Sequence, residues 1–377
     1  MNLTLKEIAR ALGTETKSNI TITSVSTDTR KIEQGSLFVC LKGDNFDAHD
    51  FVMQAVDKGA AAVVAEREVE STVPVLKVES TKTAFLQIAS LYRNKFDIPV
   101  VGLTGSVGKT TTKEMIYRVL SEKYHTLKTE GNLNNEIGLP TTLLRLNEEY
   151  SAAVIEMGMS AFGEISRLTN TAKPTIAVIT NIGVSHIEFL GSRDGILKAK
   201  CEIFEGLKKG SYAILNGDDD KLITVKKDDY KIVFFGIENK ECFVRAEDIA
   251  SDGENTSFTV VFGNKKQPVT IPTVGLHNVY DALAAFTVGI CQGMDEKKIA
   301  LGLSKYEPAG MRQRIRKIGE ITVVEDCYNA SPDSQKAAVN TLCCLDGKRK
   351  IAVLGDMLEL GSHSASLHSS VGEYVKS

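Results

Sequence analysis

The residues best suited to bind phosphate lie in one glycine-rich segment, residues 104–112 (TGSVGKTTT). Its glycines let the backbone curl so that successive N–H groups face an anion, and the N-terminus of a following helix adds partial positive charge. Lys109 can reach the terminal phosphates of a nucleotide, and the Thr110 hydroxyl can bind Mg²⁺. Leu103 stands where the strict phosphate-loop pattern has a glycine. The alternative is an ordinary glycine turn, but the position between a strand and a helix favours nucleotide binding.

Two further side chains could hold a metal ion beside that nucleotide. Glu156 lies near the end of the apolar run 152–157 (AAVIEM), and His186 follows the run 175–180 (TIAVIT). Parallel sheets place ligand-binding groups at the carboxyl ends of their strands. By spacing alone, however, Glu156 could equally be a solvated strand end, and a lone histidine is more often structural than a ligand.

A mainly parallel sheet is the element that would position these groups. Short apolar runs of strand type occur at residues 99–104, 152–157, 175–180, 212–215 and 232–235. After the phosphate loop, Met115, Ile116, Val119 and Leu120 fall on one face of a helix. Apolar strands that alternate with helices predict an α/β fold in which helices cover both faces of the sheet.

The length of 377 residues predicts two or three domains. We expect boundaries at residues 96–99, where a proline disfavours helix, and at residues 307–310. The predicted domains are therefore 1–97, 98–310 and 311–377. Strands are predicted at 321–325 and 350–354 in the last domain, which is small for an independent core and is expected to be truncated.

The overall composition argues against several classes of partner. The formal net charge is only -3, from 45 basic and 48 acidic side chains, so we expect no nucleic-acid partner. Apolar runs stay well short of the ~20 residues that span a membrane, so membrane insertion is not expected. Seven scattered cysteines without a CxxC pair favour a reducing compartment, the cytoplasm. Nothing requires more than a monomer.

Several segments together resemble the Mur ligase family of ATP-dependent peptide ligases, in the family's order and over essentially the whole chain. These segments are TGSVGKTTT at 104–112, EGNLNNEIG at 130–138, VIEMG at 154–158, TNIGVSHIEFLGSRDGILKAKCEIF at 180–204, LHNV at 276–279 and GMR at 310–312. The resemblance implies three domains: a small N-terminal α/β domain that binds a UDP-linked substrate, a central phosphate-loop domain, and a Rossmann-like C-terminal domain.

Three segments are similar to the family member that adds a dipeptide: GNLNNEIGLPTTLLRL at 131–146, DCYNASPDS at 326–334 and GDMLELG at 355–361. That similarity implies a role in peptidoglycan precursor synthesis. ATP would phosphorylate the terminal carboxylate of UDP-N-acetylmuramoyl-tripeptide, and the amine of D-alanyl-D-alanine would attack the acyl phosphate. We assign no chemical role to GDMLELG.

The resemblance also implies roles for individual residues. Thr110 and Glu156 would bind one Mg²⁺, and His186 would bind a second Mg²⁺ together with a carbamate on Lys200. A carbamate needs a neutral amine, so burial must lower the pKa of Lys200. The implied catalytic residues are Lys109, His186, Lys200 and Arg312. The implied ATP-binding residues are Gly105, Ser106, Val107, Gly108, Lys109, Thr110, Thr111, Asn278, Arg312 and Asp326. The implied UDP-binding residues are Ser26, Thr27, Asp28, Arg30 and His49.

Structural roles are the alternatives for several of these residues. Asn278 could cap a helix, Asp326 could end a strand, Arg312 could form a surface ion pair, and Lys200 could be a solvated helix charge.

Two other functions compete with the dipeptide ligase. A sister ligase, either an amino-acid-adding muramoyl-peptide ligase or a folyl-polyglutamate synthase, would share the phosphate loop. The segment STDTR at 26–30 favours a UDP-sugar over a folate. The second alternative is a truncated remnant that binds UDP-peptide and ATP without turnover. On that reasoning we expect intact nucleotide contacts but weak or absent catalysis.

Overall fold

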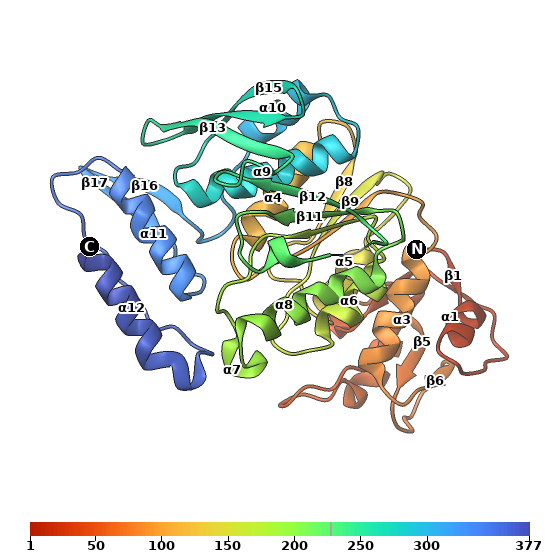
Figure 1. The fold of residues 1–377 in the computed structure, drawn as a ribbon. Helices are drawn as coiled ribbons and strands as arrows, with labels where there is room; N and C mark the ends of the chain where they lie inside the picture. The colour runs from red at the N-terminus through yellow and green to blue at the C-terminus, as the bar shows by residue number, and fades with distance from the viewer. Residues whose placement is uncertain (227) are drawn as a thin grey trace. The chain divides into compact units, whose positions relative to one another are not determined.

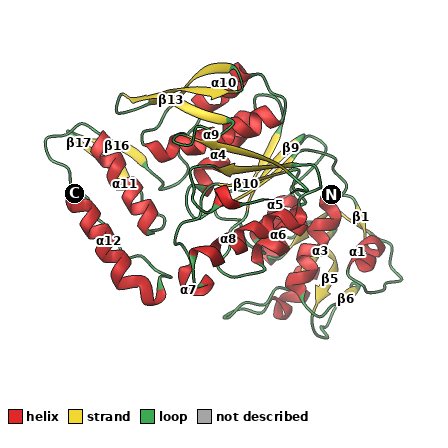
Figure 2. Ribbon diagram, viewed as in Figure 1, coloured by secondary structure: helices red, strands yellow, loops and turns green. Residues whose placement is uncertain are grey.

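The computed structural model describes residues 1–226 and 228–377, which form two compact units. The first unit holds residues 1–98, 132–149 and 170–172, and the second holds residues 99–131, 150–169 and 173–377. Figure 1 follows the chain by colour, and Figure 2 distinguishes its helices from its strands. The three predicted domain ranges stay predictions.

The first unit contains a small parallel sheet with strand order β3-β4-β5-β6. Its strands are β3 (Ser24–Ser26), β4 (Ser36–Val39), β5 (Ala60–Ala65) and β6 (Val75–Lys77), and β1 (Leu3–Thr4) pairs antiparallel with β2 (Thr21–Ile22). Its helices are α1 (Leu5–Ala11), α2 (Val52–Asp57), α3 (Thr81–Arg93) and α5 (Gly138–Leu143). Thr4 and Glu7 form a capping box that begins α1.

The second unit contains a nine-stranded sheet with strand order β15-β14-β13-β12-β11-β10-β7-β9-β8. Its strands are β7 (Val100–Thr104), β8 (Thr126–Lys128), β9 (Ala152–Glu156), β10 (Ile176–Ile179), β11 (Tyr212–Asn216), β12 (Lys231–Gly236), β13 (Val244–Ser251), β14 (Thr256–Phe262) and β15 (Lys265–Ile271). Neighbours from β8 to β13 are parallel, and β14 and β15 continue the sheet antiparallel. The predicted α/β fold with a mainly parallel sheet is confirmed.

Helices α4, α9 and α10 pack together beside this sheet, as Figure 1 shows. The helices of this part are α4 (Lys109–Leu120), α6 (Glu164–Ala172), α7 (Ile187–Leu190), α8 (Arg193–Cys201), α9 (Leu276–Cys291) and α10 (Glu296–Ser304). Met115, Ile116, Val119 and Leu120 are fully buried in the core, as the helical pattern predicted.

Residues 311–377 form a hairpin and two helices of the second unit. The hairpin joins β16 (Arg314–Ile318) to β17 (Ile321–Glu325), and the helices are α11 (Pro332–Cys344) and α12 (Ser364–Lys376). The two helices lie side by side (Figure 1), and the Tyr374 hydroxyl donates to Asn340 Oδ1 at 2.7 Å. Short 3₁₀ helices are η1 (Thr29–Lys31), η2 (Ala48–Phe51), η3 (Glu202–Gly206), η4 (Leu222–Thr224) and η5 (Gly361–His363).

The strand predicted at 350–354 is wrong. This segment is irregular, and its side chains Ile351 and Val353 are 62% and 92% exposed. A strand needs a neighbour to accept and donate its ladder hydrogen bonds. No strand pairs with this segment in the part of the chain that the structure describes. Within the same residues, no helix is long and apolar enough to cross a bilayer.

Candidate active site

The glycine-rich loop connects β7 to α4 and takes the conformation that its sequence predicts. Gly108 begins α4 with a φ of 82°, in the left-handed region that favours glycine. Gly105 packs so closely against the next strand's end that a Cβ there would lie 1.8 Å from Thr180 Oγ1. The loop therefore requires glycine at both positions, and it leads into the N-terminus of a twelve-residue helix.

Asn181 holds this loop from the end of the neighbouring strand β10. Its side-chain oxygen accepts from the Val107 N–H at 3.0 Å, and its side-chain nitrogen donates to the Val107 carbonyl at 3.1 Å. The Ser106 N–H donates to the Asn181 carbonyl at 3.1 Å. These contacts fix the loop before any ligand binds, which lowers the entropic cost of binding.

Lys109 lies over the loop to which it belongs. Its ammonium donates to the carbonyls of Gly105 at 2.8 Å and Ser106 at 3.3 Å. Burial lowers the pKa of Lys109, whereas the charge of Glu156 raises it and the charge of Arg312 lowers it. These interactions show that Lys109 shares one electrostatic environment with two other predicted site residues.

Thr110 and Glu156 form a pair of oxygen donors at the start of α4. The Thr110 hydroxyl lies 3.5 Å from Glu156 Oε1, and Glu156 is 1% exposed at the end of β9. The Glu156 N–H donates to Thr129 Oγ1 at 3.0 Å, which fixes the strand end. A hydroxyl and one carboxylate suit Mg²⁺, which usually takes one or two carboxylates together with phosphates and water.

Among residues 1–226 and 228–377, no group of three or more His, Cys, Asp and Glu side chains gathers to hold a metal ion. An all-protein cage is thus not formed by those residue types. The Thr110–Glu156 pair fits the other arrangement, in which the nucleotide's phosphates complete the coordination.

Lys200 is buried near the end of α8. It is 1% exposed, and burial together with the positive charge of Lys109 holds the pKa of Lys200 well below its usual value. Lys198, two residues earlier, is exposed, and its ammonium lies 5.7 Å from the centre of the Phe162 ring. The structure therefore separates a neutral buried amine from an ordinary surface lysine on the same helix.

His186 follows β10 with a φ of 63°, in the left-handed region. Its Nδ1 pairs with the carboxylate of Glu359. Burial lowers the pKa of His186, while Glu359 raises it and the charges of Lys109 and Lys200 lower it. His186 is therefore within electrostatic reach of both lysines.

The residues predicted near the base and ribose of ATP meet at Gln313. Asn278 is buried, and its amide donates to the Val274 carbonyl at 2.7 Å and to Gln313 Oε1 at 3.1 Å. Burial raises the pKa of Asp326, while hydrogen bonds from Gln313 and the charge of Arg312 lower it. The Arg312 guanidinium stacks 4.1 Å from the centre of the Tyr328 ring. The nucleotide-contacting roles of Asn278, Arg312 and Asp326 stay predictions.

The residues predicted to bind UDP lie in the first unit. Ser26 ends β3, and Thr27 follows it, partly buried. Asp28 caps η1 and forms an ion pair with exposed Arg30, which lowers the pKa of Asp28 to about 2.

His49 has structural partners at both ring nitrogens. Its Nδ1 lies 2.5 Å from Asp47 Oδ1, and its Nε2 accepts from the Glu66 N–H at 2.9 Å. This buried ring fixes a loop of the first unit, and its contact with UDP stays a prediction.

Several residues of the site have no role in the sequence interpretation: Asn181, Asp281, Gln313 and Glu359. Asp281 lies on α9 and accepts from the Thr112 hydroxyl at 2.5 Å, directly behind Gly108. The position of Asn181 just after a predicted strand could have indicated it. Asp281, Gln313 and Glu359 contact partners far away in sequence, so their environment follows only from the fold.

Comparisons with known proteins give a consistent result. Residues 21–93 match the Mur ligase family catalytic domain, residues 103–289 the Mur ligase middle domain, and residues 312–377 the Mur ligase glutamate ligase domain. The chain is 43% identical to the UDP-N-acetylmuramoyl-tripeptide--D-alanyl-D-alanine ligase of Bacillus subtilis (strain 168), covering 94% of this chain and 78% of that protein. It is 38% identical to the enzyme of that name from Escherichia coli (strain K12), covering 100% and 84%.

Solved structures agree with the sequence relatives. A MurF crystal structure from Acinetobacter baumannii superposes with a TM-score of 0.94 at 32% identity, covering 100% of this chain and 84% of that one. The MurF ligase of Thermotoga maritima, solved in complex with ADP, superposes with a TM-score of 0.87 at 31% identity, covering 93% and 82%.

Proposed function

This chain belongs to the Mur ligase family, and from that premise we propose that it joins D-alanyl-D-alanine to UDP-N-acetylmuramoyl-tripeptide. It is an ATP-dependent ligase that forms a C–N bond during peptidoglycan precursor synthesis and releases ADP and phosphate. The relatives that carry this activity in their names are 32% to 43% identical to it. One observation of the site carries the proposal: Lys109, Thr110, Glu156 and buried Lys200 meet where parallel strands end.

The reaction has two bond-forming steps. The terminal carboxylate of the tripeptide attacks the γ-phosphorus of ATP, so a P–O bond forms and ADP leaves as the old P–O bond breaks. The amine of D-alanyl-D-alanine then attacks the acyl phosphate. The tetrahedral intermediate collapses to the amide, releasing phosphate, and the amine loses a proton to solvent.

The main electrostatic task is to bring two anions, the carboxylate and the γ-phosphate, into contact. Lys109 and the N-terminus of α4 supply fixed positive charge at the phosphates. Asn181 holds the loop in place, so little reorganisation is needed during the reaction. Arg312 adds a further charge, and Asn278 and Asp326 contact the nucleoside.

Mg²⁺, when bound, neutralises phosphate charge during the transfer. Thr110 and Glu156 hold one ion, and His186 helps to hold a second. Lys200 carries a carbamate on this proposal: its neutral amine attacks carbon dioxide, an N–C bond forms, and a proton goes to solvent. The buried, low-pKa amine supports this assignment, because only a neutral amine reacts and the product is an oxygen ligand suited to Mg²⁺.

The UDP-linked end of the substrate binds the first unit on this proposal, at Ser26, Thr27, Asp28, Arg30 and His49. We place the protein in the cytoplasm as a monomer. Seven free cysteines suit a reducing compartment.

The decisive experiment measures phosphate release from ATP with UDP-N-acetylmuramoyl-tripeptide and Mg²⁺, with and without D-alanyl-D-alanine. Single D- and L-amino acids serve as competing acceptors. Release that requires the dipeptide supports the proposal. Release with a single amino acid would instead show an amino-acid-adding ligase, and binding of both substrates without release would show a non-catalytic binding protein.

Variants connect that activity to the site. Lys200→Met should abolish ligation, whereas Lys198→Met on the exposed face of the same helix should leave it unchanged. Incubation with ¹³C-bicarbonate should give a carbamate carbon signal in the parent and in Lys198→Met, but not in Lys200→Met. A signal that persists in Lys200→Met would contradict the carbamate assignment.

A further inference from the structure

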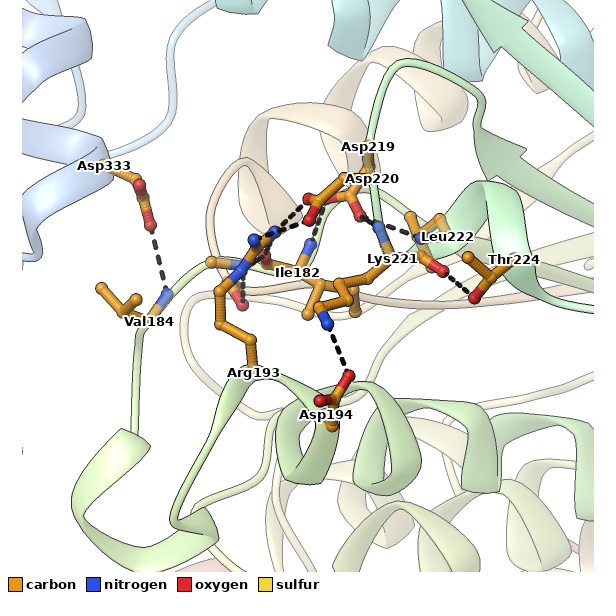
Figure 3. Close-up of polar contacts among 12 residues, drawn as sticks. Ile182, Val184, Arg193, Asp194, Asp219, Asp220, Lys221, Leu222, Thr224 and Asp333 are labelled. Carbon is orange, nitrogen blue, oxygen red and sulfur yellow. Dashed lines mark hydrogen bonds and ion pairs between the residues drawn. The ribbon is translucent and has the colours of Figure 1, made fainter.

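The loop between β10 and α7, residues 180–186, is held by side chains from three directions. On one side the Gly183 N–H donates to Ser106 Oγ of the phosphate loop at 2.9 Å. On another, Asp219 Oδ2 accepts from the Ile182 N–H at 2.7 Å, and Arg193 donates twice to the Ile182 carbonyl (Figure 3). This loop ends at His186, so its backbone is fixed just before the imidazole.

The third direction is the C-terminal region. Asp333, in the first turn of α11, accepts from the Val184 N–H at 3.3 Å (Figure 3). A Cβ on Gly183 would lie 2.1 Å from Asp333 Oδ2, so the glycine makes room for this carboxylate. Residues 311–377 therefore contact the histidine loop directly.

A second contact from that region reaches the imidazole itself. The Glu359 carboxylate pairs with His186 Nδ1, and the Glu188 N–H donates to the Glu359 carbonyl at 3.3 Å. Both members of the pair are left-handed, with a φ of 60° at Glu359 and 63° at His186. Such conformations are costly for non-glycine residues and persist where the surrounding structure enforces them, often at functional sites.

We propose that Glu359, in the segment GDMLELG, is a positioning residue that fixes the ring orientation and tautomer of His186. The inference rests on the proposed function, because that function makes His186 a metal ligand. It gives the segment 355–361 a chemical task, performed through His186 rather than on the substrate.

The chemistry follows from the donors and acceptors. An ionised carboxylate only accepts hydrogen bonds, so His186 Nδ1 carries the proton and Nε2 keeps its lone pair. Metal-binding histidines commonly donate their second N–H to a carboxylate in this way, and removal of that partner typically lowers metal affinity or activity about 10- to 100-fold. Asp333 adds to the effect by fixing the backbone of the loop.

The direct test is the protonation of the ring nitrogens, measured by two-bond ¹H–¹⁵N NMR on the full chain labelled at histidine, without nucleotide or Mg²⁺. His186→Asn identifies the signal among the six histidines. We expect the Nδ1–H tautomer in the parent and a mixture in Glu359→Ala. Glu359→Gln should restore the Nδ1–H tautomer, because its amide oxygen also accepts.

Asp356→Ala is the matched control, because this aspartate belongs to the same segment and its side chain is 92% exposed. It should leave the His186 signal unchanged. An Nε2–H tautomer in the parent, or an unchanged signal in Glu359→Ala, would overturn the inference.

A second measurement separates this inference from the proposed function. The Mg²⁺ concentration for half-maximal ligation should rise about 10- to 100-fold in Glu359→Ala, and much less in Glu359→Gln. An active parent whose Mg²⁺ dependence is unchanged in Glu359→Ala would overturn the positioning role. The expected tautomer in a parent that ligates nothing would support the positioning role and reject the proposed function.

Discussion

Asp281 offers a stability prediction that can be worked out from its surroundings. It is buried on α9 behind the phosphate loop, and it accepts a 2.5 Å hydrogen bond from the Thr112 hydroxyl. Its Oδ1 lies 2.6 Å from the point where a Cβ on Gly108 would stand. Burial raises the pKa of Asp281 from its ordinary 3.8 to about 7, although the Thr112 hydrogen bond acts in the opposite direction.

The sign of the effect follows from proton binding. Between pH 4 and pH 7 the unfolded chain has lost the proton of Asp281, whereas the folded chain keeps it. The folded state then binds more protons, so the contribution of Asp281 to the free energy of unfolding falls as pH rises through this range. A pKa shift of about three units corresponds to roughly 4 kcal/mol when the change is complete.

Asp281→Asn removes the ionisable group and keeps an oxygen that can accept from Thr112. The variant should therefore lack this loss of stability at high pH. We expect its free energy of unfolding, relative to the parent, to increase by about 2–3 kcal/mol between pH 5 and pH 8. This change with pH is independent of the fixed difference between a buried amide and a buried carboxylic acid.

Urea unfolding at pH 5, 6, 7 and 8 measures the effect, with stability taken from the linear dependence on denaturant. Asp346→Asn, at an exposed position, is the control and should show a constant difference from the parent. A difference for Asp281→Asn that stays constant within ~0.5 kcal/mol, or narrows toward pH 8, would refute a protonated Asp281 in the folded chain.

Three further predictions concern burial and capping. Because the pKa of Lys200 is lowered in the folded chain, Lys200→Met should raise the free energy of unfolding at pH 7 in buffer free of carbon dioxide, and this gain over the parent should shrink as pH rises toward 10.5; Lys198→Met should show neither effect in the same denaturant titrations. Leu283→Ala removes a fully buried side chain from the core of α9 and should cost about 2–5 kcal/mol, whereas Leu301→Ala, at a 48% exposed position, should cost less than about 1 kcal/mol; equal losses in urea unfolding would contradict this packing. Ser331→Ala removes the capping box of α11 and should lower stability by about 1 kcal/mol, and Ser331→Asp should recover most of it; identical unfolding midpoints for all three proteins would argue against the cap.

The sequence determined the features that depend on nearby residues. The apolar runs at 99–104 and 152–157 correspond to strands β7 and β9, and the glycines of 104–112 form the loop between strand and helix. These predictions succeeded because burial periodicity and glycine conformation act over a few residues. The resemblance to the Mur ligases added the family, which the comparisons confirmed.

The tertiary structure decided which distant residues meet. Strand order places β7 between β9 and β10, which brings Glu156 and Asn181 to the phosphate loop from opposite sides. Thr112 and Asp281 meet across 169 residues, and His186 and Glu359 across 173. No local pattern encodes such contacts.

The strand wrongly predicted at 350–354 shows the same limit. Its residues have the composition of a strand, but a strand exists only where a neighbour supplies ladder hydrogen bonds. The low pKa of Lys200 is likewise a consequence of packing, because identical charge and helix position leave Lys198 exposed. Residue type and spacing thus determined the chemistry available to this chain, while the desolvation and long-range contacts that select among its side chains arose only on folding.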